Sequence, residues 1–171
     1  MTNYSFNEYK DAVQLFAEKK EKGVIFPNSN ASHASIVISE LINQTEKEIF
    51  IYDKSVSGDL VDLNPEIIDN LEKKAGEKIK INIIVDNINS INSGLQKILD
   101  QYSNVKLDTA TDQFISKIKE NLGGLYYFTL SDGTKFRLES SKENRKAICS
   151  FNESYYTSIL NKILCDSNFS N

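Results

Sequence analysis

Two short polar segments carry the side chains that could bind or transform a ligand. Each directly follows an apolar stretch with the pattern of a buried strand, residues 49–52 and 81–85. The residues are Asp53, Lys54 and Ser55 after the first stretch, and Asp86, Asn87 and Asn89 after the second. If the strands are parallel neighbours, their carboxyl ends meet at one crevice, where open α/β sheets bind ligands. A metal-dependent hydrolase that uses Asp53 and Asp86 is one interpretation, and two solvated loop starts are the alternative.

A basic segment near the end of the chain offers a different chemistry. Its cations are Lys135, Arg137, Lys142, Arg145 and Lys146. Lys135 and Arg137 share one side of a predicted strand, while Phe136 takes the opposite side, because successive strand residues alternate. With the Phe136 side on the core, the basic side is expected to face solvent, where it would contact phosphates or an acidic partner. The formal net charge of −4 argues against a general nucleic-acid binder.

The clearest local structure is a β-hairpin over residues 125–139. Its two β-rich halves flank Asp132-Gly133, and a two-residue type I′ turn needs positive φ at both central positions. A further strand at 146–150 leads to Ser150-Phe151-Asn152 and a closing amphipathic helix.

This arrangement resembles the C-terminal half of a phospholipase D-like domain, over roughly residues 30–165. That family carries the motif His-x-Lys-x4-Asp, in which the His attacks phosphorus and the Lys binds the phosphoryl oxygens. With Asp132 at the last position, Leu125 and Tyr127 stand where His and Lys belong. Leucine is not a nucleophile, and tyrosine carries no positive charge at neutral pH. The resemblance therefore implies the fold without its catalysis, and it assigns no catalytic residue.

The chain has few histidine and cysteine residues that could serve in catalysis or metal binding. His33 is the only histidine, in the first turn of a predicted helix, and we expect an ordinary surface or capping residue. A two-histidine mechanism would need a dimer built around it. Cys149 is expected to be a buried, inert thiol. With Cys165 as the only other cysteine, no zinc site and no cofactor are predicted.

Strands that alternate with helices of about ten residues predict an α/β fold. The expected sheet is mixed and mostly parallel, with helices on both faces and a C-terminal β-hairpin. Helices are expected at 5–22, 32–44, 65–76, 93–102, 112–121 and 152–164. Residues 1–30 are interpreted as an N-terminal helix and connector, and 31–171 as a single phospholipase D-like α/β domain.

The functional hypothesis is a non-catalytic interaction or regulatory subunit with a protein partner, and self-association as a homodimer is an alternative. Small members of this kind are similar to accessory components of bacterial multi-gene systems, including defence against phage. Nucleic-acid binding through the basic hairpin is a second hypothesis, and the metal-dependent hydrolase a third. No apolar run is long enough to span a membrane, and we expect a cytoplasmic protein.

Overall fold

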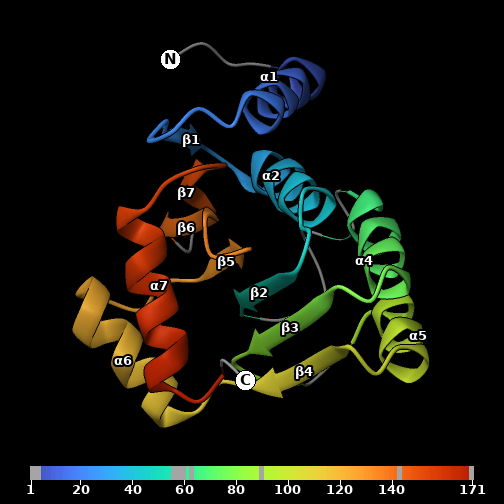
Figure 1. Ribbon diagram of the computed structural model, residues 1–171, viewed down its shortest axis with the longest axis vertical. Coiled ribbons are helices and arrows are strands. Elements are labelled where there is room, and N and C mark those ends of the chain that lie inside the picture. The colour runs from blue at the N-terminus through green and yellow to red at the C-terminus, as the bar shows by residue number, and fades with distance from the viewer. Residues whose placement is uncertain (1–4, 55–60, 62–63, 89–90, 142–143, 170–171) are drawn as a thin grey trace.

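The computed structural model describes residues 5–54, 61, 64–88, 91–141 and 144–169. Strands and helices alternate through its first two thirds, and three consecutive strands and a helix follow (Figure 1). The elements are α1 (Phe6–Lys19), β1 (Phe26–Asn28), α2 (Ala31–Asn43), β2 (Glu48–Asp53), α4 (Glu66–Gly76), β3 (Lys80–Val85), α5 (Ser93–Gln101), β4 (Val105–Thr109), α6 (Asp112–Leu122), β5 (Phe128–Ser131), β6 (Lys135–Ser141), β7 (Lys146–Ser150) and α7 (Tyr155–Asp166).

The strands form one seven-stranded mixed sheet in the order β1-β7-β6-β5-β2-β3-β4. The predicted mixed α/β architecture is confirmed, but the expected balance of strand directions is wrong. Only β2–β3 and β3–β4 are parallel pairs in the described part of the chain, whereas the other four pairs are antiparallel. The hairpin and the strand after it form an antiparallel meander, and this meander joins the outer side of β2.

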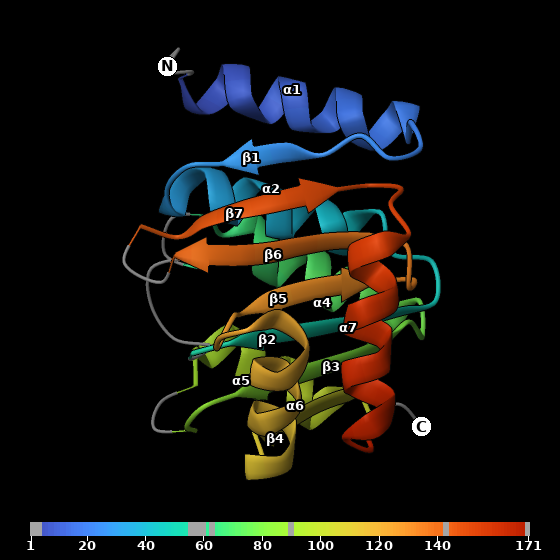
Figure 2. The same ribbon diagram turned by 90° about the vertical axis from the view of Figure 1, so that its left-hand side faces the viewer.

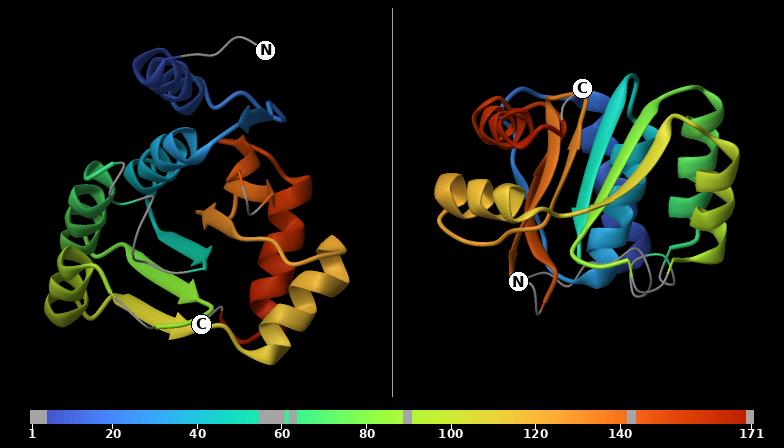
Figure 3. Two further views of the ribbon diagram at one scale, coloured as in Figure 1. Left: turned by 180° about the vertical axis from the view of Figure 1, so that it is seen from behind. Right: turned by 90° about the horizontal axis from the view of Figure 1, so that it is seen from below.

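Helices cover both faces of the sheet, as predicted. On one face, α4, α5 and part of α2 pack on the isoleucine-rich sides of β2 and β3. On the other face, α6 and α7 pack on aromatic and aliphatic side chains of β2, β5 and β6 (Figures 1 and 3). Because β2 and β3 are buried on both faces, their sequences are nearly continuous apolar runs.

The first helix covers one edge of the sheet. Tyr9, Val13 and Ala17 form its buried side and pack with α2, β1 and β7. Ser5 caps the helix through a reciprocal capping box with Glu8. Figure 2 shows α1 lying along the outer side of β1, so the N-terminal helix is packed onto the sheet.

Local signals in the sequence account for several element ends. Asp132 and Gly133 have φ of 51° and 68°, and the Thr134 N–H donates to the Ser131 carbonyl at 3.1 Å, which confirms the predicted turn. The sequence predicts Ser32 as the cap of α2. The structure instead begins the helix at Ala31, with Asn30 as the N-cap that accepts the His33 N–H. None of the described helices is long and apolar enough to cross a membrane.

Candidate functional site

The parallel pairing of β2 with β3 places Asp53 opposite Val85, directly before Asp86. The predicted convergence at the carboxyl ends of these strands is therefore present in the backbone. Lys54 and Asn87 are exposed there, and Asp86 is half-buried. The predicted site residues Ser55 and Asn89 lie outside the described residues.

Asp53 is held by an arginine from a distant part of the chain. The two terminal nitrogens of Arg145 donate to its two carboxylate oxygens, at 3.1 Å to Oδ1 and 2.9 Å to Oδ2. The Lys54 N–H also donates to Oδ1, at 2.6 Å. A forked contact of this kind is among the stronger ion-pair geometries in proteins.

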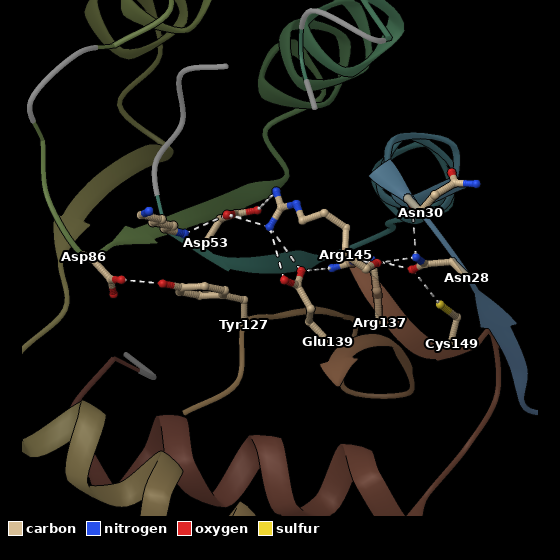
Figure 4. Close-up of polar contacts among 10 residues, drawn as sticks. Asn28, Asn30, Asp53, Asp86, Tyr127, Arg137, Glu139, Arg145 and Cys149 are labelled. Carbon is tan, nitrogen blue, oxygen red and sulfur yellow. Dashed lines mark hydrogen bonds and ion pairs between the residues drawn. The ribbon is translucent and has the colours of Figure 1, made fainter. Parts of the chain in front are cut away.

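The same arginine begins a longer chain of contacts across the sheet (Figure 4). Arg145 Nη1 also donates to Glu139 Oε2 at 3.1 Å, and this oxygen accepts Arg137 Nη1 at the same distance. Arg137 Nε donates to Asn28 Oδ1 at 2.8 Å. Arg137 Nη2 donates to the Arg145 backbone carbonyl at 3.0 Å. We call Asn28, Asp53, Arg137, Glu139 and Arg145 the arginine network. It ties together β1, β2, β6 and the turn that precedes β7.

The arginine network is buried, which corrects the expectation of an exposed basic face. Arg137 and Glu139 are 1% and 2% exposed, Arg145 is 9% and Lys135 is 4%. Both sides of β6 are covered, because Phe136 and Leu138 are buried as well. Two cations face two carboxylates, so the network balances its own charge. Of the predicted basic residues that the structure describes, only Lys146 is exposed, and Lys142 lies outside the described residues.

Burial shapes the acid–base properties of this region. Desolvation raises the pKa of Glu139, and the nearby Asp53 carboxylate raises it further, against the lowering effect of Arg137 and Arg145. Burial also raises the pKa of the Cys149 thiol, to about 12. This thiol is therefore protonated at neutral pH, as expected of an inert cysteine.

Asp86 is engaged by two tyrosines. The Tyr52 hydroxyl donates to Oδ1 at 2.7 Å, and the Tyr127 hydroxyl donates to Oδ2. Burial raises the pKa of both phenols, and the hydrogen bonds to Asp86 raise it further, so both are neutral donors. Each carboxylate of the predicted pair thus has protein donors on both oxygens. Within the described residues, no three His, Cys, Asp or Glu side chains gather as a metal site would require.

The degenerate motif forms no common site, because Asp132 is separated from Leu125 and Tyr127. Leu125 packs against the core between the sheet, α6 and α7. Tyr127 is buried with its hydroxyl on Asp86. Asp132 lies at the opposite end of β2, where its carboxylate accepts the backbone N–H groups of residues 46, 47 and 48 and an ion pair from Lys135. We call Asp132 and Lys135 the hairpin cluster.

His33 is buried, which corrects its prediction as a surface residue. Its ring stacks on Tyr9, with centroids 3.7 Å apart and planes 3° from parallel. A hydrogen bond of 3.0 Å joins Ser29 Oγ and His33 Nδ1. The imidazole therefore helps to fasten α1 to α2.

Sequence reasoning missed Asn28 and Glu139 as members of the site. Asn28 falls in the predicted connector of residues 1–30, and Glu139 falls on the same strand side as Arg137, which was expected to be exposed. A signal for Glu139 is nevertheless present, because a carboxylate two residues after Arg137 shares its side of the strand.

Comparisons with known proteins bear on the fold. No profile of a known protein family matches the chain, and no curated protein sequence does. Among solved structures, Nuc from Salmonella typhimurium, a phospholipase D family member, is 13% identical, with a TM-score of 0.54 over 85% of this chain and 95% of that one. The chain has a phospholipase D-like fold.

Two further structures are similar. NucT from Helicobacter pylori is 17% identical, with a TM-score of 0.51 over 85% of this chain and 95% of that one. TrmBL2, an archaeal chromatin protein whose structure shows a novel mode of DNA binding, is 12% identical, with a TM-score of 0.56 over 94% of this chain. The match spans only 58% of the TrmBL2 chain. At these identities the likeness concerns the fold alone.

Proposed function

We propose that this chain is a non-catalytic phospholipase D-like module that acts as an interaction or regulatory subunit. The observation that carries the proposal is the arginine network. Its two arginines and two carboxylates bind one another, and Asp86 is held by Tyr52 and Tyr127. Charged groups that are already paired and buried are unsuited to attack a phosphorus atom or to stabilise its developing charge.

The single histidine supports the same conclusion. A mechanism with histidine as nucleophile needs an imidazole that reaches the substrate. His33 instead packs face to face with Tyr9 beneath α1. The exposed polar residues Lys54 and Asn87 at the ends of β2 and β3 form the surface that we assign to a protein partner. By its resemblance to small phospholipase D-like proteins, that partner would be another component of a bacterial multi-gene system.

This proposal is tested by capture from the native cell with the full chain as bait. We expect at least one protein to bind saturably, and its binding to drop at least tenfold when Lys54→Glu and Asn87→Lys are introduced together. Lys162→Glu, on the exposed side of α7, is the matched control and should bind as the natural chain does. Loss of binding in the control alone, or no saturable partner, contradicts the proposal.

DNA binding is a second candidate, supported by the likeness to TrmBL2. It does not rest on the predicted basic face, because Lys135, Arg137 and Arg145 are buried. Backbone contacts to DNA release counterions, so the affinity should fall steeply between about 50 and 200 mM salt. Fluorescence anisotropy with a labelled duplex measures this dependence. No binding at the lowest salt concentration would remove this candidate.

A further inference from the structure

The two edges of the sheet differ in how their backbone groups are covered. At β1, Pro27 has no N–H, and its carbonyl accepts the Tyr9 hydroxyl at 2.9 Å. The helix α1 also lies along this edge (Figure 2). At the other end of the sheet, no strand in the described part of the chain pairs with the outer side of β4. Figure 1 shows β4 at the border of the molecule, opposite α1.

The register of β4 determines which of its backbone groups point outward. The Ile81 N–H donates to the Asn104 carbonyl at 2.9 Å, and the Ala110 N–H donates to the Val85 carbonyl at 2.8 Å. Backbone groups of a parallel strand alternate between its two neighbours. Lys106 and Asp108 therefore direct their N–H and C=O groups toward β3, whereas Leu107 and Thr109 direct theirs outward.

We propose that two copies of this chain associate through β4, which pairs antiparallel with β4 of a second copy. The two-fold axis passes through Leu107, perpendicular to the sheet. Leu107 then exchanges two backbone hydrogen bonds with the partner's Leu107, as directly opposed residues do in a hydrogen-bonded antiparallel pair. Thr109 lies opposite the partner's Val105. The result is one continuous sheet through both copies.

The charges of β4 select this register over its neighbours. With the axis at Leu107, Lys106 lies directly opposite the partner's Asp108, and the symmetry repeats this pair. A shift that centres the axis on Lys106 would oppose two lysines, and one centred on Asp108 would oppose two aspartates. Opposite charges that face each other across an antiparallel pair stabilise it, and like charges destabilise it. Lys106 and Asp108 are both exposed in the single chain, and they point to the same side of the strand.

Sheet edges are normally protected against unwanted pairing by charges, proline or a covering element. The β1 edge uses Pro27 and α1. On the β4 edge the alternating charges are self-complementary only in the antiparallel register described here. They therefore favour this register and disfavour the two registers centred on Lys106 and on Asp108.

Sedimentation equilibrium on the full chain tests the proposal. Reversing one charge should weaken dimerisation, and reversing both should restore it. The natural chain should show a monomer–dimer equilibrium with a dissociation constant below about 1 mM. A weak affinity of this order is typical of small interfaces. Lys106→Glu should raise the dissociation constant about tenfold, because two attractive pairs become repulsive. Asp108→Lys should do the same. An equimolar mixture of the two variants should form a heterodimer, since the glutamate introduced in one chain then faces the lysine introduced in the other. The double variant should regain self-association, because both pairs are again of opposite charge.

Three results of the sedimentation experiment would overturn the proposal. One is a natural chain that remains monomeric at about 1 mM. Another is a dimer that neither single variant weakens, which would place the interface elsewhere. The third is a mixture of the two variants that stays monomeric.

Hydrogen exchange supplies an independent measurement on the natural chain. The Leu107 amide should exchange more slowly as the protein concentration rises. An unchanged rate across the dimerisation range also contradicts the pairing. None of these results depends on the partner protein proposed above.

Discussion

Two clusters of buried charge lie at opposite ends of β2, and they use their charges differently. In the arginine network, side chains bind side chains: Arg137 and Arg145 share Glu139, and Arg145 also holds Asp53. In the hairpin cluster, the acid binds backbone, because Asp132 accepts three N–H groups at the start of β2 in addition to Lys135. The first cluster joins three strands and the turn before β7, and the second fixes one turn against one strand.

The pKa values of Glu139 and Asp132 are shifted in opposite directions. Burial dominates for Glu139 and raises its pKa, although two arginines oppose the change. Burial also raises the pKa of Asp132, but the hydrogen bonds from Lys135 and the three N–H groups together outweigh it, and the pKa lies below its ordinary value. A carboxylate whose pKa is lowered stabilises the fold in its ionised form. We infer that the intact hairpin cluster adds to stability, whereas the intact arginine network chiefly fixes the arrangement of the strands. Removing one member of the network is still costly, because a buried charge then loses its partner.

The largest effect is expected from Arg137→Met. This change leaves Glu139 with one cation and removes the donors to Asn28 Oδ1 and to the Arg145 carbonyl. Removing one partner of a buried ion pair costs about 3–5 kcal/mol, so the free energy of unfolding should fall by roughly that amount in urea denaturation. Lys97→Met, on the exposed side of α5, is the control and should change it by less than about 0.5 kcal/mol. An Arg137 variant as stable as the control would mean that the network is not formed.

A smaller effect is expected from Asp132→Asn, which sharpens the comparison because it removes only the charge. Asparagine tolerates the positive φ of 51° at this position. The lost ion pair and the weakened backbone contacts should cost about 2 kcal/mol at pH 7. Urea denaturation of both proteins measures the difference.

The pH dependence of this difference follows from the lowered pKa of Asp132. The advantage of the natural chain over Asp132→Asn should be present above the unfolded pKa of about 3.9. It should be lost as the pH falls through the lower folded pKa. A difference that is constant from pH 7 to pH 2 would contradict the assignment.

The smallest of these effects is expected from Tyr127→Phe. The ring stays packed against Tyr52, at a centroid distance of 5.0 Å, and only the hydroxyl donor to Asp86 is lost. The free energy of unfolding should fall by about 1 kcal/mol, since Asp86 is half-buried and water can replace the donor. Tyr155→Phe, whose ring is exposed, should have no measurable effect in the same assay. Equal losses in the two variants would show that the Asp86 contact does not contribute.

Local patterns were sufficient to predict the elements of this fold. The capped and amphipathic helices, the apolar runs of β2 and β3 and the turn at Asp132-Gly133 all lie close to where the sequence places them. The directions of the strands were harder to predict, because two parallel strands next to a hairpin do not reveal how the hairpin joins the sheet. Here β5 lies antiparallel beside β2, and this pairing makes the antiparallel pairs the majority.

The candidate site was predicted only in part. The convergence of Asp53 and Asp86 follows from parallel strands, which a sequence can indicate. The burial of Arg137 and Arg145 depends on partners far away in the sequence, since Asp53 is 92 residues from Arg145 and Asn28 is 109 residues from Arg137. The alternation within β6 showed which residues share a side, but it gave no indication that α2 would pack against β6.

Phosphodiester hydrolysis by the purified full chain tests the central claim most directly. The natural chain and His33→Ala are assayed on bis(p-nitrophenyl) phosphate and on single-stranded DNA, with a known phosphodiesterase as the positive control. The account predicts that neither protein releases product above the rate of the buffer. Hydrolysis by the natural chain that disappears when His33, Asp53 or Asp86 is replaced, in a variant that remains folded, would contradict it.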